Sequence, residues 1–343
     1  MISKSKSREI RDLLEDSQNP LFFFDNDQDG LCSYLILRRF LGRGRGVPVK
    51  TNPLTKEYIK RVREFSPDRV FVLDVPEISN DFLEELFESN IPLVHIDHHK
   101  VQRSKYYNKI SYYNSSSRSG DGEPVTVICY NVAEKREDIW LGVIGAISDK
   151  YFPPFYKVFL SLYPDLALES NNPFEILYNS GIGDIARMLG AGLKDRTTNV
   201  MKMIRFLINS RGPYDLANDN KEDFVFYKRF KDLEKKMDLL IRKAKKNLDE
   251  EKLLFFKYSG EVSMSADISN KLSYLYPKKY VVVAYAKGNF VNISARGEQI
   301  KKKIMPLLKK IKDSKGGGHE NAVGAQLPLA SLDFFVEELK KSI

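Results

Sequence analysis

The stretch Ile91–His99 (IPLVHIDHH) ends an apolar run with three of the four histidines that the chain contains. A short apolar run of this kind is typical of a buried strand, and ligand sites in open α/β sheets form where such strands end. Histidine is the most common side-chain ligand of metals and titrates near neutral pH. The sequence therefore predicts a strand over 91–96 that presents Asp97, His98 and His99 for chemistry.

Two earlier apolar runs of the chain also lead to an aspartate. Residues 20–24 are followed by Asp25, and residues 69–73 are followed by Asp74. Amphipathic helical patterns separate the three runs, over 30–41 and 81–89. This strand–helix–strand order is typical of βαβ units and predicts an α/β fold with a mainly parallel N-terminal sheet and flanking helices.

The strands of a parallel sheet end along one edge, so the acids that follow them are expected to converge. The candidate set is Asp25, Asp27, Asp74, His98 and Asp149, of which the last follows an apolar helix over 139–147. Clustered carboxylates raise one another's pKa unless a cation neutralises them. Oxygen ligands together with an imidazole favour Mn²⁺ or Mg²⁺ over a metal that prefers thiolates.

Several of these residues also have an interpretation other than a metal site. The run Asp25–Gly30 (DNDQDG) begins like a calcium-binding loop, but the twelfth position is Ile36 instead of glutamate, which excludes that site. Asp29 is either a support of the metal site or a residue that caps the next helix or braces the turn. Asp74 is either a ligand or a turn residue, and His95 is expected to pack inside the sheet.

Length and composition favour a globular protein of two domains. The chain has 343 residues, of which 42% are hydrophobic and 29% charged. A turn-rich segment is predicted over 114–124 and buried helices over 125–133 and 139–147. Helical patterns over 174–209 and 232–249 precede renewed strand patterns near the C-terminus. The expected division is residues 1–210 for an N-terminal catalytic domain, 211–250 for a helical linker with a connecting helix, and 251–343 for a smaller α/β domain with a mixed sheet.

Cysteine usage and charge bear on location and partners. Cys32 and Cys129 lie in apolar runs without CxxC spacing, which is typical of reduced core residues and favours a cytoplasmic protein. No stretch reaches the ~18 apolar residues of a membrane helix, so no membrane partner is expected.

Residues 251–343 contribute +7 to the net charge of +9. This favours a domain that faces a polyanion, with a solvated lysine-rich surface as the alternative.

Several short motifs occur together and in order along the chain. The N-terminal ones are Asp25-x-Asp27-x-Asp29-Gly30, Asp74, Asp97-His98-His99 and Ser148-Asp149, and the C-terminal ones are Asn292–Gly297 (NISARG) and Gly316–Gly324 (GGGHENAVG). In these motifs the chain resembles the DHH phosphoesterase superfamily with its DHH-associated C-terminal domain. Within that superfamily it is most similar to archaeal RecJ-like single-strand nucleases.

The resemblance implies a role for each N-terminal motif residue. The metal ligands would be Asp25, Asp27, Asp74, His98 and Asp149, with Asp74 bridging two Mn²⁺ or Mg²⁺ ions. His99 would position phosphate or assist the leaving group, and Asp97 would orient the site from behind. Some branches carry a histidine four residues before the first motif aspartate. Leu21 stands there in this chain, so occupancy of the second ion site, with Asp29 as a substitute support, is left open.

The C-terminal motifs are expected to bind substrate. Strand alternation places Asn292 and Arg296 on one face, where the Arg296 guanidinium is a candidate bidentate hydrogen-bond donor to phosphate. A loop of three glycines would let backbone N–H groups approach an anion, with His319 as an added donor, although such a loop is usually only a turn. The expected clamp for phosphate or a terminal nucleotide consists of Asn292, Arg296, Gly316, Gly317, Gly318 and His319.

The leading functional hypothesis is a metal-dependent phosphodiesterase, an exonuclease that hydrolyses single-stranded DNA or RNA from an end by attack of a metal-activated water. One alternative is a phosphodiesterase for oligoribonucleotides, cyclic dinucleotides or a nucleoside bisphosphate. The other is a non-catalytic scaffold in replication or repair. A helicase or another replisome or repair protein is a candidate partner, with the lysine-rich segment 301–312 as one docking surface or simply a solvated helix face. Polarity, DNA or RNA preference and oligomeric state do not follow from the sequence.

Overall fold

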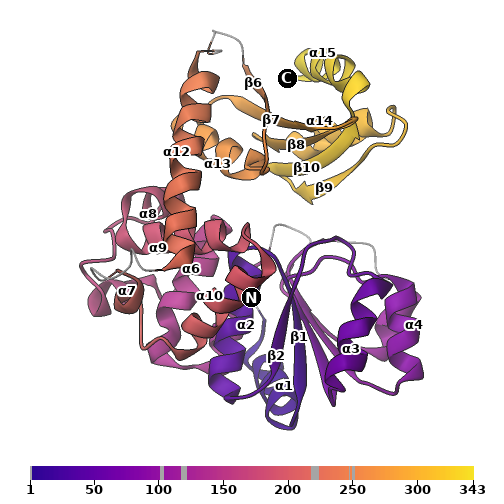
Figure 1. The fold of residues 1–343 in the computed structure, drawn as a ribbon, viewed down its shortest axis with the longest axis vertical. Coiled ribbons are helices and arrows are strands. Elements are labelled where there is room, and N and C mark those ends of the chain that lie inside the picture. The colour runs from indigo at the N-terminus through magenta and orange to yellow at the C-terminus, as the bar shows by residue number, and fades with distance from the viewer. Residues whose placement is uncertain (1, 101–103, 117–121, 218–223, 247, 249–251) are drawn as a thin grey trace. The chain divides into compact units, whose positions relative to one another are not determined.

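The computed structural model describes residues 2–100, 104–116, 122–217, 224–246, 248 and 252–343. The chain forms two structural units, Met1–Phe230 and Lys231–Ile343, and each contains one five-stranded sheet with helices on its faces (Figure 1). The predicted α/β class, with a parallel N-terminal sheet and a mixed C-terminal sheet, is therefore confirmed. Among the described residues, no helix combines the length and the apolar character that crossing a membrane requires.

The sheet of the first unit has the strand order β2–β1–β3–β4–β5, and all neighbouring strands are parallel. Its elements are α1 (Lys4–Glu15), β1 (Pro20–Asp25), α2 (Gln28–Leu41), β2 (Arg45–Val49), α3 (Ile59–Phe65), β3 (Arg69–Leu73), α4 (Asn80–Glu88), β4 (Leu93–Asp97) and β5 (Ser111–Asn114). The three predicted strands are β1, β3 and β4, whereas β2 and β5 were not predicted. Both unpredicted strands lie at the edges of the sheet, and their sequences, RGVPV and SYYN, lack an apolar run like those of β1, β3 and β4.

Three successive phenylalanines of β1 explain why this strand lies in the middle of the sheet. Phe22 and Phe24 point to one face, where they contact Tyr34 of α2. Phe23 points to the other face and meets Phe82 of α4 edge to face, at 5.7 Å between ring centroids. Both faces of the strand are thus buried, as expected for a parallel sheet with helices on each side (Figure 1).

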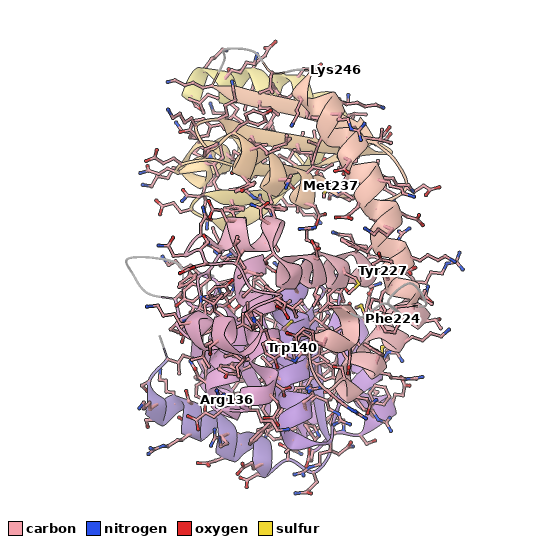
Figure 2. The ribbon with its side chains drawn as sticks, turned by 90° about the vertical axis from the view of Figure 1, so that its left-hand side faces the viewer. Arg136, Trp140, Phe224, Tyr227, Met237 and Lys246 are labelled. Carbon is pink, nitrogen blue, oxygen red and sulfur yellow. The ribbon has the colours of Figure 1, made fainter. Side chains whose placement is uncertain are left out.

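A helical region completes the first unit. Its helices are α5 (Val125–Ala133), α6 (Ile139–Ser148), α7 (Tyr156–Leu162), α8 (Pro173–Asn179), α9 (Gly181–Leu193), α10 (Thr197–Asn209) and α11 (Tyr214–Ala217). Helix α6 is apolar on all sides, and its Trp140 is fully buried (Figure 2). Cys32 and Cys129 are both buried and reduced, as predicted. The predicted buried helices over 125–133 and 139–147 correspond to α5 and α6.

The connecting helix α12 (Val225–Lys245) begins seven residues earlier than predicted. Tyr227 lies near its start and Met237 near its middle, and Lys246 follows its end (Figure 2). The unit boundary falls after Phe230, inside this helix. The last part of the predicted segment includes residues 247 and 249, which lie outside the described residues.

The sheet of the second unit has the strand order β6–β7–β8–β10–β9, in which only β6 and β7 are parallel. Its elements are β6 (Leu253–Ser259), α13 (Ser265–Leu275), β7 (Tyr280–Lys287), β8 (Phe290–Arg296), α14 (Ile300–Leu308), β9 (Lys315–His319), β10 (Ala322–Pro328) and α15 (Leu332–Ser342). Helices α14 and α15 cover one face with a core that includes Ile293, Ile304 and Phe335. Helix α13 covers β7 and β8 on the other face.

Two loop predictions were wrong in part. Gly316–Gly318 lie in the edge strand β9, paired antiparallel with β10, so these glycines do not form the expected loop and anion nest. Glycine has no side chain to alternate between faces, and this strand therefore leaves no periodic signal in the sequence. The turn-rich segment predicted for 114–124 begins with Asn114, which is the last residue of β5, and its residues 117–121 lie outside the described residues.

Candidate metal centre

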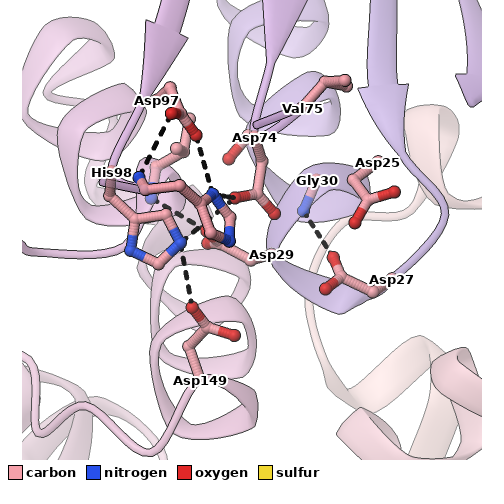
Figure 3. Close-up of polar contacts among 12 residues, drawn as sticks. Asp25, Asp27, Asp29, Gly30, Asp74, Val75, Asp97, His98 and Asp149 are labelled. Carbon is pink, nitrogen blue, oxygen red and sulfur yellow. Dashed lines mark hydrogen bonds and ion pairs between the residues drawn. The ribbon is translucent and has the colours of Figure 1, made fainter. Parts of the chain in front are cut away.

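The carboxyl ends of three adjacent strands bring the N-terminal motif residues together (Figure 3). Asp25 ends β1, Asp97 ends β4, and Asp74 directly follows β3. The backbone N–H of Asp74 donates to the carbonyl of Ile96, which extends the pairing of β3 with β4 by one residue. The predicted convergence of strand-end acids at one sheet edge is what the structure contains.

Asp74 stands at the centre of this cluster. Its carboxylate belongs to three groups of metal-ligating side chains whose donor atoms lie within 4.8 Å of one another. These groups are Asp25, Asp27 and Asp74; Asp29, Asp74 and His98; and Asp74, Asp97 and His99. Asp74 is buried and has a backbone φ of 61°, a left-handed conformation that aspartate tolerates better than most residues. A central carboxylate of this kind is the one expected to contact more than one ion.

His98 and two carboxylates have the spacing of ligands on a single ion. The Nε2 atom of His98 lies 3.3 Å from Oδ1 of Asp74 and 3.3 Å from Oδ2 of Asp149. Neighbouring ligands around an octahedral ion with bonds of about 2.1 Å are about 3 Å apart. The buried Oδ1 of Asp74 accepts no hydrogen bond from a described residue. The donor set, its spacing and this buried oxygen therefore fit Mn²⁺ or Mg²⁺.

Asp149 reaches the centre from a helix rather than from a strand. It follows the last residue of α6, and its backbone N–H donates to the carbonyl of Gly145. Helix α6 packs against α2, the helix that follows the first acidic motif. The next residue, Lys150, has a φ of 61°, so the chain turns sharply away directly after Asp149.

The acidic motif at the end of β1 turns tightly into α2. Oδ1 of Asp27 accepts the backbone N–H of Gly30 at 3.0 Å, so Asp27 is the residue that caps this helix. A Cβ atom at position 30 would lie 2.4 Å from the carbonyl oxygen of Asp25. Only glycine permits this close approach, which is the physical reason for the Asp-Gly pair of the motif.

Asp29 has a structural task in addition to its place beside Asp74 and His98. Its two carboxylate oxygens accept the backbone N–H groups of Val125 and Thr126, each at 2.9 Å. The hydroxyl of Thr126 donates to the carbonyl of Asp29 at 2.8 Å. Asp29 therefore braces the first turn of α5, a helix far along the chain, and does not cap α2 as the alternative interpretation supposed.

Asp97 and His99 form an ordered pair. Oδ1 of Asp97 accepts from Nδ1 of His99 at 2.8 Å, and Oδ2 accepts the backbone N–H of His99 at 3.1 Å. Burial lowers the pKa of His99, but its hydrogen bond to Asp97 and the neighbouring negative charges outweigh burial and raise the pKa to about 9. Burial alone would raise the pKa of Asp97, but the His99 hydrogen bond and the nearby imidazoles lower it.

The remaining carboxylates are buried close together and repel one another when they are ionised. Burial, reinforced by neighbouring carboxylates, raises the pKa of Asp25 to about 6. The same two causes raise the pKa values of Asp27 and Asp74 well above the ordinary value for aspartate. Burial and the Asp149 charge also raise the pKa of Asp29. A bound cation removes this conflict, because it stabilises the ionised form of every carboxylate around it.

His95 packs inside the sheet, as predicted. Its Nε2 atom lies 2.8 Å from the carbonyl oxygen of Val75, and its Nδ1 lies 3.2 Å from the hydroxyl of Tyr107. Because Val75 directly follows Asp74 (Figure 3), this contact of His95 holds the chain next to the central carboxylate.

Two polar residues of the site were missed from the sequence. Asn114 contacts Asp97 and the backbone of His99, and Thr126 contacts Asp29. Asn114 ends β5 as Asp97 ends β4, and the two residues are register partners. The signal was present in the short SYYN run that ends with Asn114, but four residues are too few to establish a strand.

The predicted substrate residues of the second unit share part of one sheet face. Asn292, Ser294 and Arg296 lie opposite the core residues Val291, Ile293 and Ala295, as strand alternation predicted. Ala322 pairs with Arg296 on one side and with His319 on the other, so these three residues form one row across β8, β10 and β9. The Nε of Arg296 donates to Oδ1 of Asn270 at 2.7 Å.

The glycines of β9 divide between the two faces. Gly317 pairs with Gly324 in the same strand pair that holds His319. A Cβ atom at either of these positions would meet nothing within 4 Å, so this part of the face is bare backbone. Gly316 and Gly318 point to the α14 face, where an added Cβ would collide with Leu308 and with the backbone of Ala322, respectively.

Two family models match the sequence. The DHH family, N-terminal domain, matches residues 21–143, and the DHHA1 domain matches residues 251–343. The chain therefore belongs to the DHH superfamily and carries the DHHA1 domain in its C-terminal part. A comparison with curated protein sequences gives no match.

Solved structures share the fold at low sequence identity. RecJ in complex with Mn²⁺ from Thermus thermophilus has a TM-score of 0.70 at 15% identity over 98% of this chain, which spans 54% of that RecJ chain. CDC45 from Entamoeba histolytica has a TM-score of 0.57 at 12% identity and 99% coverage of both chains. The pGpG-specific phosphodiesterase PggH from Vibrio cholerae has a TM-score of 0.52 at 13% identity, covering 95% of this chain and 98% of that one.

Proposed function

We propose that this protein is a Mn²⁺- or Mg²⁺-dependent phosphodiesterase that degrades single-stranded DNA or RNA from one end. The observation that carries the proposal is the cluster around Asp74, in which aspartates and His98 have the spacing of metal ligands. When bound, such an ion supplies a Lewis acid for phosphoryl oxygens and lowers the pKa of a water molecule. Membership of the DHH superfamily supports this chemistry.

The residues divide into those that hold the ions and those that act on the phosphate. Asp25, Asp27, Asp74, His98 and Asp149 would be the ligands, with Asp74 shared between two ions and Asp29 as a support. His99 would donate a proton or hydrogen bond to a phosphate oxygen through Nε2, because its Nδ1 is committed to Asp97. The hydrogen bond to Asp97 raises the pKa of this imidazole and so favours its protonated form.

The second unit would bind the substrate chain. Arg296 and His319 are basic or polar side chains in one row across small Ala322, a spacing that suits a phosphate group. Asn292 and the bare backbone of Gly317 would contact the adjoining sugar or base, with Gly316 and Gly318 shaping the strand. The excess of positive charge in residues 251–343 favours a polyanion as substrate. In this proposal residues 1–210 are the catalytic domain, 211–250 the linker and 251–343 the substrate domain, in a cytoplasmic protein.

Two alternatives each have an observation in their favour. The fold similarity to PggH over nearly the whole of both chains favours a substrate of only a few nucleotides. The comparable fold similarity to CDC45 favours a scaffold that binds a helicase or another replication protein. We prefer an active enzyme because each N-terminal motif acid is retained and lies near Asp74 or His98.

Digestion of single-stranded DNA and RNA of graded length, labelled at the 5′ or the 3′ end, tests these functions directly. With Mn²⁺ we expect progressive loss of nucleotides from one end of strands longer than about ten residues. Preference for two to four nucleotides would support the short-substrate enzyme instead. The control is the variant in which Asp97, His98 and His99 are all alanine. If the wild-type protein and this control are equally inactive on every substrate, the hydrolase proposal is wrong.

A further inference from the structure

The amide of Asn114 is fully engaged at the end of β5. Its Nδ2 donates to Oδ2 of Asp97 at 3.3 Å and to the carbonyl of His99 at 3.0 Å, and it lies 2.7 Å from the hydroxyl of Tyr112. Its Oδ1 accepts the backbone N–H of Ser116 at 2.7 Å and the hydroxyl of the same serine. One side chain thus connects the chain before it, the chain after it and both ends of the Asp97–His99 turn.

The contact from Asn114 adds to the hydrogen bonds that the carboxylate of Asp97 accepts from His99. The carboxylate of Asp97 is fully buried and accepts both the ring N–H and the backbone N–H of His99. Asn114 adds a third donor to this carboxylate and grips the carbonyl of the very residue whose ring Asp97 orients. The turn 97–99 is therefore fixed at its first residue and at its last by a single amide.

The position of Asn114 is set by the sheet and is independent of the metal ligands. Asn114 is the register partner of Asp97 across β4 and β5, and the backbone N–H of Ser115 donates to the carbonyl of Asp97 at 3.2 Å. No contact joins Asn114 to Asp25, Asp27, Asp74, His98 or Asp149 among the contacts of the described residues. Within the described part of the chain Asn114 touches none of these ligands, so removal of its side chain should disturb the His99 ring more than it disturbs His98, which lies between Asp97 and His99 and also contacts Asp74 and Asp149.

We infer that Asn114 is a positioning residue, which holds the Asp97–His99 pair so that the His99 ring meets the substrate phosphate in one orientation. Partners behind a catalytic group typically contribute about 10- to 100-fold to activity. The kinetic consequence rests on the proposed hydrolase function, whereas the ordering of the His99 ring does not.

The first experiment compares Asn114→Ala, the isosteric Asn114→Asp and the control Asn131→Ala, which changes an exposed asparagine of α5. We expect kcat to fall about 10- to 100-fold in both Asn114 variants, with KM and calorimetric Mn²⁺ affinity changed less than about threefold. Asn114→Asp retains the shape but loses the donors, so equal activity of this variant and wild type overturns the proposal. A parallel loss of Mn²⁺ affinity and kcat also overturns it, because Asn114 would then support the ions.

A double-mutant cycle separates positioning from general destabilisation. If Asn114 acts through His99, the double variant His99→Ala/Asn114→Ala should be no less active than His99→Ala alone. Additive losses would mean that Asn114 acts elsewhere, and the proposal would fail.

An NMR experiment on the metal-free protein needs no activity. The His99 Nδ1–H proton, identified by its loss in His99→Ala, should give a sharp downfield resonance in wild type that broadens or disappears in Asn114→Ala and persists in Asn131→Ala. An unchanged resonance overturns the inference even if the protein proves to be a hydrolase, and a changed resonance supports it even if no substrate is cleaved.

Discussion

The candidate metal centre of the first unit and the glycine-bearing face of the second unit differ in charge and in burial. Around Asp74, burial and mutual repulsion raise the pKa of several aspartates, and the surrounding fold holds them together at a cost. On the β8–β10–β9 face, Gly317 and Gly324 carry no side chain. The neighbouring polar side chains, Arg296 and His319, point to this face because side chains alternate along a strand. The first region therefore has the charge that a cation would neutralise, whereas the described residues of the second region have no such charge conflict and present a face of bare backbone and polar side chains.

The largest effect is expected from Asp74→Asn, which removes one charge from the centre of the cluster and tolerates the same left-handed backbone. Hydrolysis with Mn²⁺ should fall at least about 1,000-fold, which corresponds to about 4 kcal/mol in the barrier. In EDTA the variant should melt at a higher temperature than wild type, because a buried charge conflict is relieved. Asp12→Asn, on the exposed face of α1, is the matched control. Wild-type turnover in Asp74→Asn would remove this residue from the centre.

The next effect is the stabilisation of the first region by metal and its dependence on pH. The pKa of Asp25 rises from 3.8 to about 6 on folding, so stability in EDTA falls as the pH rises from about 4 to above 6. The pKa values of Asp27, Asp29 and Asp74 shift in the same direction. Mn²⁺ at 100 times its Kd would restore about 2.7 kcal/mol.

Thermal melts in Mn²⁺ and in EDTA between pH 4 and pH 7.5 measure this effect. The difference between the two melting temperatures should grow with pH. A constant difference would show that the carboxylates of the first region are not in conflict.

A pair of glycine substitutions sharpens the contrast between the two regions. Gly30→Ala should destabilise the protein by about 1–3 kcal/mol, because its Cβ would lie 2.4 Å from the Asp25 carbonyl oxygen. Gly317→Ala should change the free energy of unfolding by less than about 1 kcal/mol, because its Cβ meets open space. Urea denaturation of both variants measures the two effects. Equal destabilisation would contradict the picture of a tight turn in one region and an open face in the other.

A moderate effect on substrate affinity is expected from Arg296→Ala in the second region. Affinity for a labelled single strand should fall about tenfold, or about 1.4 kcal/mol, with the melting temperature nearly unchanged. Arg296→Lys should recover part of the affinity, because it retains the charge without the planar fork. Lys257→Ala, an exposed position of β6, controls for the loss of one positive charge. Equal affinity of Arg296→Ala and Lys257→Ala would exclude a specific role for Arg296.

Much of the first region was predictable because its chemistry follows local patterns. Each apolar run that became β1, β3 or β4 ends at the predicted residue or within one of it, and each is followed by a motif acid or histidine. The rule that parallel strands end at one edge then sufficed to group Asp25, Asp74 and His98. His95 was predicted to be structural because it alternates into a buried strand, and its contact with Val75 agrees.

The less predictable part depends on contacts between distant segments. The bonds from Asp29 to Val125 and Thr126 join residues almost one hundred positions apart, and no local pattern encodes them. Asn114 was hidden in a four-residue edge strand, and the edge strand of Gly316–Gly318 was hidden by the absence of side chains.

The sequence by itself determined the class of fold, the superfamily and the candidate residues of the metal centre, because buried strands and strand-end acids leave periodic and local signals. Only the tertiary structure decided which groups support those residues. It assigned Asp27 to the cap of α2, Asp29 to the start of α5 and Asn114 to the Asp97–His99 turn. The physical reason is that a hydrogen bond depends on distance and direction in space. Both are set by how segments far apart along the chain pack against one another, and a local sequence pattern does not encode that packing.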